Sequence, residues 1–87
     1  MNEDYEILES LKDLKLRGVR YLYSKYGEGM VIVAFHMLGD TDKAKELVYD
    51  TFWKLWRENK FTDVTPPLRP FLYKEIQRAS LKTISPC

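Results

Sequence analysis

The sequence predicts an all-α protein, built as a compact bundle of about four helices. Apolar residues recur every three or four positions along most of the chain, with charged residues between them. No segment alternates apolar and polar residues as a half-buried strand does. Gly39-Asp40 and Pro66-Pro67 interrupt the helical pattern and divide it into segments. At 87 residues the chain is long enough for one small domain with a single core.

The first two helices are predicted from the spacing of their apolar residues. One is expected over residues 4 to about 16, with Tyr5, Leu8, Leu11 and Leu14 facing the core. The other is expected from about residue 17 to 38, with an apolar set of Val19, Leu22, Tyr23, Tyr26, Met30, Val33, Ala34 and Met37. Gly27 and Gly29 weaken it locally, because a glycine costs up to about 1 kcal/mol relative to alanine in a helix interior.

A turn at Gly39 and Asp40 separates the second helix from a third, which is expected from Thr41 to about Asn59. Gly39 suits the end of one helix and Asp40 can cap the next. Asp42 adds negative charge to the first turn of that helix, where it is favourable. The inward stripe is expected to be Ala44, Leu47, Val48, Thr51, Phe52 and Leu55.

A loop with three prolines occupies residues 61–70, because the pair Pro66-Pro67 cannot lie inside a helix. Pro70 suits the first position of a fourth helix that should end near Ile84, before Ser85-Pro86. Its inward stripe is expected to be Leu72, Ile76, Ala79 and Thr83, with Lys74, Arg78 and Lys82 on the opposite side. The predicted core of the domain is Leu22, Tyr26, Val33, Leu47, Phe52, Leu55, Leu72 and Ile76.

Composition argues against several classes of function. The single cysteine, Cys87, excludes an internal disulfide. The chain also has only one histidine, His36, so no set of zinc ligands exists. We therefore expect no metal and no cofactor. No nucleophile elbow or phosphate-binding glycine loop is present, so catalysis is not expected. The longest apolar run is far below the roughly 18 residues that span a bilayer, and no signal peptide opens the chain, so we expect the cytoplasm.

Charge is distributed unevenly although the formal net charge is only +1. Residues 1–13 carry five acidic side chains against one lysine, whereas residues 69–87 carry four basic side chains against one glutamate. The C-terminal part alone could therefore meet phosphate.

Three stretches together resemble the core of bacterial extracytoplasmic-function sigma factors: LYSKYG at 22–27, MLGDTDKAKELVYDTFWKLW at 37–56 and LRPFLYKEIQRASL at 68–81. The resemblance covers nearly the whole chain, and the middle stretch matches at many positions over a fixed spacing. It implies region 2 of a sigma factor, a helical domain that binds RNA polymerase and contacts the melted minus-ten promoter element.

The last helix departs from the family pattern. Where the family usually has an asparagine that reads the promoter, this chain has Arg78. Sigma factors of this type also carry a C-terminal helix-turn-helix domain, region 4, and nothing after Leu81 supplies it. The whole chain, residues 1–87, is accordingly expected to be a region 2-like domain, whether as a fragment of a longer protein or as a one-domain relative.

A second surface is predicted on the third helix, off the core stripe. It consists of Asp42, Glu46, Tyr49, Asp50 and Trp53. Exposed aromatic residues among carboxylates are typical of a protein interface. The resemblance implies that this face binds the β′ clamp helices of RNA polymerase. The alternative is that Trp53 packs under the proline-bearing loop.

Two features are candidates for contact with the single-stranded nontemplate strand. Arg69, Lys74, Arg78 and Lys82 form a basic strip that could neutralise phosphates, or alternatively a solvated helix face. The loop opens with Phe61, Thr62, Asp63 and Val64, and the resemblance implies that it captures a flipped base. The alternative is that the loop only connects two helices.

A rival interpretation comes from a different class of function. The chain could be a protein-interaction module that binds polymerase or an anti-sigma factor without reading DNA. The altered fourth helix and the missing helix-turn-helix favour this interpretation, and the basic strip counts against it.

Overall fold

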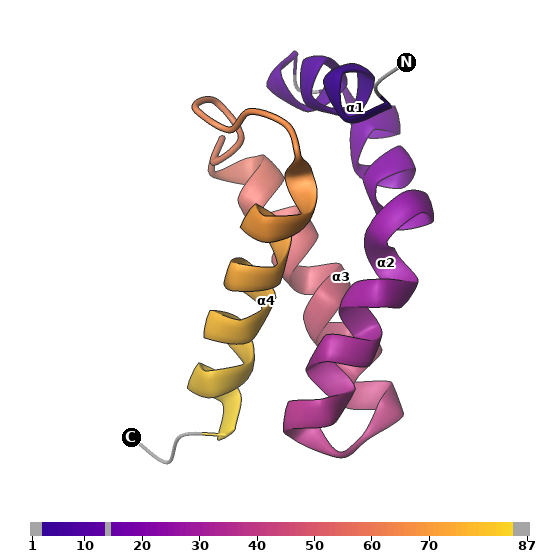
Figure 1. Cartoon of the computed structure of the whole chain (residues 1–87), viewed down its shortest axis with the longest axis vertical. Coiled ribbons are helices and arrows are strands. Elements are labelled where there is room, and N and C mark those ends of the chain that lie inside the picture. The colour runs from indigo at the N-terminus through magenta and orange to yellow at the C-terminus, as the bar shows by residue number, and fades with distance from the viewer. Residues whose placement is uncertain (1–2, 14, 85–87) are drawn as a thin grey trace.

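The computed structural model describes residues 3–13 and 15–84, and the fold is all-helical (Figure 1). It contains α1 (Glu3–Lys12), α2 (Leu16–Leu38), α3 (Thr41–Arg57) and α4 (Leu68–Ile84). The helices α2, α3 and α4 follow the long axis of the molecule and pack against one another, while α1 lies across one end of them. No strand occurs in the described ranges, so the predicted helical bundle is confirmed.

One continuous core fills the space between the four helices. Six of the eight predicted core residues are buried, and Val33 and Leu47 lie half-buried at its margin. The buried hydrophobic residues are Ile7, Leu8, Leu11, Val19, Leu22, Tyr26, Met30, Ala34, Ala44, Val48, Phe52, Leu55, Phe61, Leu68, Leu72 and Ile76.

The predicted inward face of the first helix is correct for Leu8 and Leu11 and wrong for Tyr5. Tyr5 is 64% exposed, and the buried residues of α1 are Asp4, Ile7, Leu8 and Leu11. These four follow the i, i+3, i+4, i+7 spacing of one helix face. The predicted stripe included Tyr5 and omitted Ile7 and Asp4, and Asp4 was considered only as one of the acidic residues of this segment. Leu14, also expected on that face, lies outside the described residues.

The first helix also ends at Lys12, earlier than the expected residue 16, because the chain turns sharply into α2. Gly18 permits this turn. A Cβ atom at Gly18 would lie 3.0 Å from the backbone nitrogen of Leu11 and 3.0 Å from Cβ of Ser10. The two helices therefore approach more closely at this point than a larger residue would allow.

The turn between α2 and α3 is formed as expected. Gly39 has φ 72°, in the left-handed region that favours glycine, and its N–H donates to the carbonyl of Phe35. The carboxylate of Asp40 accepts a hydrogen bond from the N–H of Lys43 at 3.0 Å, which caps α3.

The fourth helix begins at Leu68, two positions before the expected Pro70. Pro70 is accommodated because N–H groups of the first turn have no partner within the helix. The buried residues of α4 are Leu68, Leu72, Ile76 and Ser80, spaced by four. Thr83, expected to face inward, is exposed, and its hydroxyl donates to the carbonyl of Ala79. None of the described helices is long and apolar enough to cross a membrane.

Candidate functional site

An aromatic cluster joins α2 to the outer flank of α3. Tyr49 meets Tyr23 edge to face with ring centroids 5.9 Å apart, and Tyr23 meets the buried Phe52 in the same way at 6.0 Å. Trp53 stacks edge-on against Tyr49 at 6.0 Å and against Trp56 at 5.3 Å. The cluster thus runs from the core to the surface, where Tyr49 is 51% exposed.

A shallow hollow of about 420 Å³ opens beside this cluster. Its lining is mostly aromatic and aliphatic, and Arg20 and Ser24 add polar groups to it. The residues around it are Leu16, Val19, Arg20, Tyr23, Ser24, Tyr49, Phe52 and Trp53. Aromatic side chains around an apolar depression are typical of a protein-binding surface.

The predicted surface of α3 divides into two parts. Tyr49 and Trp53 lie on the side of α2, whereas Glu46 and Asp50 line a hollow of about 430 Å³ on the side of α4. Asp42 is exposed in the first turn of α3. The ring contacts of Trp53 are with Tyr49 and Trp56, so they lie within α3 and not in the proline-bearing loop.

The basic residues of α4 also fall on different sides. Arg78 and Lys82 border a hollow of about 310 Å³ between α3 and α4, and Lys74 is exposed. Arg69 lies instead against α2, with its guanidinium carbon 5.9 Å from the centroid of the Tyr26 ring. The predicted strip therefore comprises Lys74, Arg78 and Lys82, and Arg69 does not belong to it.

The hollow between α3 and α4 carries both signs of charge. Lys54 and Lys60 join Arg78 and Lys82 there, and the acidic residues are Asp50, Glu58 and Glu75. Arg78 pairs with Glu75 at 3.6 Å within α4. The positive potential of this surface is accordingly reduced by its own carboxylates.

Phe61 does not line the surface of the loop. Its ring is 1% exposed and packs against Phe71 with centroids 5.6 Å apart. A base therefore cannot stack on Phe61 in this conformation. Thr62 donates its hydroxyl to the carbonyl of Asn59 at 2.9 Å, and Thr62 and Asp63 are exposed.

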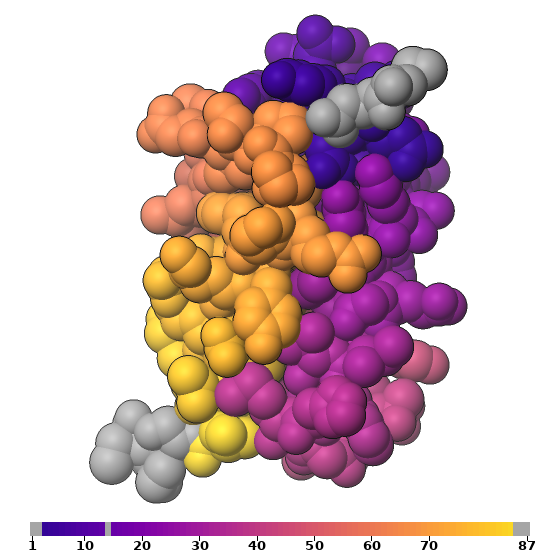
Figure 2. All heavy atoms as spheres, in the orientation of Figure 1, coloured from indigo at the N-terminus to yellow at the C-terminus, as the bar shows by residue number. Residues whose placement is uncertain are grey.

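The accessible part of the loop faces α1 and not α4. A hollow of about 340 Å³ lies between them, lined by Tyr5, Glu6, Leu8, Glu9, Lys12, Val64, Thr65 and Pro66. Figure 2 shows the loop, in orange, packed against α1, in indigo. The exposed aromatic ring beside the loop is that of Tyr5, which the helical periodicity had placed in the core.

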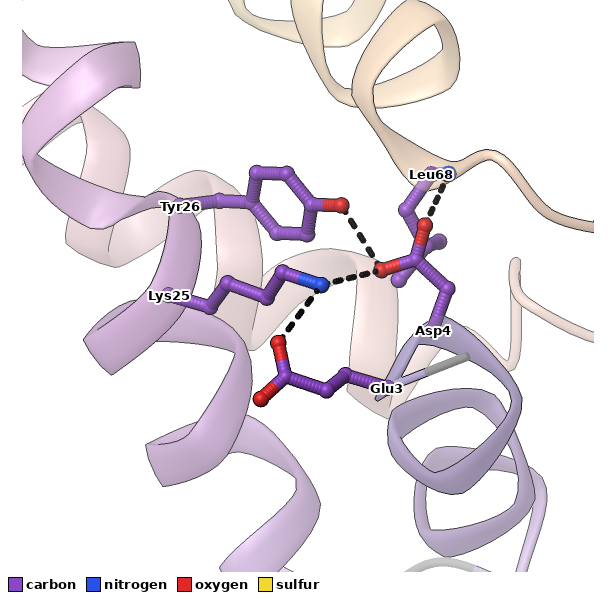
Figure 3. Close-up of polar contacts among 5 residues, drawn as sticks. All are labelled: Glu3, Asp4, Lys25, Tyr26 and Leu68. Carbon is purple, nitrogen blue, oxygen red and sulfur yellow. Dashed lines mark hydrogen bonds and ion pairs between the residues drawn. The ribbon is translucent and has the colours of Figure 1, made fainter. Parts of the chain in front are cut away.

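Asp4 connects three helices through one buried carboxylate (Figure 3). Oδ1 accepts hydrogen bonds from the hydroxyl of Tyr26 at 2.7 Å and from Nζ of Lys25 at 3.1 Å, both on α2. Oδ2 accepts a hydrogen bond from the N–H of Leu68, the first residue of α4, at 3.0 Å. Glu3 also pairs with Lys25, at 3.0 Å.

This arrangement shifts the protonation equilibria of the groups involved. Burial acts to raise the pKa of Asp4, but the hydrogen bonds from Leu68, Tyr26 and Lys25 outweigh it, so the pKa lies below its ordinary value. The hydrogen bond to Glu3, followed by the one to Asp4, raises the pKa of Lys25. Asp4 and Lys25 therefore remain charged over a wide range of pH.

Asp4 was missed because only its charge was considered. Its position, three residues before Ile7 and four before Leu8, places it on the buried face of α1. An acidic residue on an apolar stripe requires a partner, since an unpaired buried charge is costly. That spacing was the available signal, although it could not have identified Leu68 as a partner.

No family model, curated protein or solved structure matches the chain. No group of three or more His, Cys, Asp or Glu side chains in ranges 3–13 and 15–84 could hold a metal ion. Assignment of a function consequently depends on the sequence motifs and on the surfaces described above.

Proposed function

We propose that this chain is a transcription initiation factor domain of the sigma type, which binds the β′ clamp helices of RNA polymerase and contacts the melted minus-ten promoter strand. The observation that carries the proposal is the contact between Tyr49, which is half-exposed, and Trp53, which is partly buried, beside an apolar hollow. Both actions are binding without chemistry. A role with polymerase would place the protein in the cytoplasm.

The clamp contact is assigned to the flank of α3 and the adjoining part of α2. Tyr49 supplies exposed aromatic area, and its contact with Tyr23 fixes the ring before a partner arrives. A side chain that is already ordered loses less entropy on binding. Asp42 is exposed in the first turn of α3, where a carboxylate can set the register of a basic partner, whereas Glu46 lies on the side of α4 and is not part of this contact.

The DNA contact is assigned to α4 and to the loop. Lys74 and Lys82 are exposed and can approach phosphates. The hollow between the loop and α1 offers Tyr5 as a surface on which an unstacked base can lie, with Thr65 beside it. Since the net charge of the chain is only +1, the free domain should bind DNA weakly, and polymerase would supply most of the attraction.

The experiment compares binding of a single-stranded minus-ten oligonucleotide with polymerase core present and absent, for wild type and Lys74→Glu. We expect sequence-selective binding only with the core, weakened by the substitution about equally for all sequences, because a phosphate contact is lost. The matched control is Lys15→Glu, an exposed lysine between α1 and α2. Binding that ignores sequence and is unchanged in Lys74→Glu would refute the promoter contact.

A second candidate is the interaction module, which binds polymerase or an anti-sigma factor without touching DNA. The observation in its favour is that carboxylates lie among the basic residues of both hollows at which DNA would bind. Asp50, Glu58 and Glu75 line one of them, and Glu6 and Glu9 line the other. These carboxylates would repel phosphate. Clamp binding that survives without any oligonucleotide contact would favour this candidate.

A further inference from the structure

The hollow beside the loop has walls from two parts of the chain that are far apart in sequence. Tyr5, Leu8 and Glu9 come from α1, whereas Val64, Thr65 and Pro66 come from the loop. Its width therefore depends on how α1 is fixed relative to the segment that ends the loop and begins α4.

Asp4 makes that connection. Its carboxylate lies one residue before Tyr5, is only 7% exposed, and accepts the N–H of Leu68, which directly follows the loop. It thereby caps α4 from another helix, since a carboxylate at a helix N-terminus satisfies an N–H group that has no partner within the helix. Tyr26 and Lys25 hold the other oxygen and orient the carboxylate.

We propose that Asp4 is a positioning residue for the loop: it fixes α1 against the start of α4 and so sets the geometry of the hollow between Tyr5 and Val64. Its importance for base recognition depends on the proposed function, whereas its effect on the loop does not. A change at Asp4 should therefore alter the loop and α4 start more than the rest of the bundle.

Amide hydrogen exchange measured by NMR on the full chain tests the structural part. In Asp4→Asn the amide of Leu68 should exchange about tenfold faster relative to the amide of Val48, a buried residue of α3. Asn keeps one neutral acceptor oxygen in place of two charged ones, so Leu68 must compete for it with Tyr26 and Lys25 and its hydrogen bond weakens. Thr83→Ala is the matched control, since it removes a hydrogen bond near the other end of α4 and leaves all the contacts of Asp4 in place. In this control the ratio of the Leu68 exchange rate to the Val48 exchange rate should stay close to that of wild type.

An unchanged exchange rate of the Leu68 amide in Asp4→Asn would overturn the inference. An increase at Leu68 in proportion to that at Val48 would also overturn it, because it would show only a loss of global stability. If Asp4→Asn does not fold, Asp4→Glu replaces it, because it keeps the charge and moves the carboxylate by one methylene. Amide resonances of residues 61–65 should then shift more than those of α3. Equal shifts in both segments would reject the positioning role.

The functional part uses the polymerase core complex and oligonucleotides that differ at single bases. In Asp4→Asn discrimination among bases should fall while affinity for the core is retained. If wild type shows no discrimination, the proposed DNA contact fails and the exchange result stands by itself. If wild type discriminates and Asp4→Asn does so equally, the DNA contact stands and the positioning role in recognition is rejected.

Discussion

Tyr23 of α2 and Tyr49 of α3 meet edge to face with their ring centroids 5.9 Å apart. The contact links an exposed ring to the core, because Tyr23 also touches the buried Phe52. Tyr49 is therefore exposed but ordered, a combination that suits a residue at the centre of an interface.

The first prediction concerns this ring. Tyr49→Ala should weaken binding to the β′ clamp helices by about 2 kcal/mol or more, as truncation of an interface hot spot does. The matched control is Tyr73→Ala, because Tyr73 on α4 is 45% exposed, close to the 51% of Tyr49. A titration of both variants against isolated clamp helices measures the effect. Equal affinities would remove Tyr49 from the proposed interface.

The second prediction concerns Phe61, whose ring belongs to the core. Phe61→Ala should lower the free energy of unfolding by about 3 to 5 kcal/mol in the absence of DNA, because a buried ring is lost. Thr65→Ala, in the exposed part of the same loop, should change it by less than about 0.5 kcal/mol. Urea denaturation followed by circular dichroism checks both. A stability of Phe61→Ala near that of wild type would contradict the buried position.

The third prediction concerns pH. The folded pKa of Asp4 lies below the ordinary value of 3.8, so its contribution to stability is present above that value and is lost as pH falls through the folded pKa. Wild type should therefore exceed Asp4→Asn in stability at pH 7 by about 1 to 3 kcal/mol, the value of hydrogen bonds to a charged group. The difference should shrink below pH 3.8, as measured by urea denaturation across pH. A constant difference would show that the carboxylate charge does not matter.

The fourth prediction compares two glycines. Gly39→Ala should destabilise the protein by about 1 to 2 kcal/mol, because the left-handed conformation at φ 72° is unfavourable for a residue with a Cβ atom. Gly29→Ala should stabilise it by about 1 kcal/mol, since Gly29 lies inside α2 and a Cβ atom there would meet nothing within 4 Å. Thermal or urea denaturation should show that the free energy of unfolding falls in Gly39→Ala and rises in Gly29→Ala. A change in the same direction in both variants would contradict this account.

Local signals in the sequence predicted much of the fold. Gly39 and Asp40 act through their own backbone and one neighbouring N–H, so their roles could be inferred from the residues themselves. The stripe of Ala44, Val48 and Phe52 is buried as expected because it is long and regular. The helical class of the domain follows from the same regularity.

What could not be predicted depends on contacts between distant segments. Helix α4 begins at Leu68 and not at the predicted Pro70, and Asp4 caps it there. No rule based on neighbouring residues connects Asp4 with Leu68. The predicted interface of α3 was treated as a single face, yet packing against α2 and α4 divides it between Tyr49 and Asp50. Phe61 followed the loop pattern in sequence but enters the core, since Phe71 offers it a partner.

The hydrogen bond from Leu68 to Asp4 spans 64 positions, so the two residues leave the ribosome at very different times. When Asp4 emerges, the backbone group that it will cap has not been synthesised. Helix α1 can pack on α2 early through local contacts, and Tyr26 and Lys25 can already bind Asp4 at that stage. Helix α1 is therefore synthesised before α3 and α4, but it reaches its final position only after the start of α4 has been made.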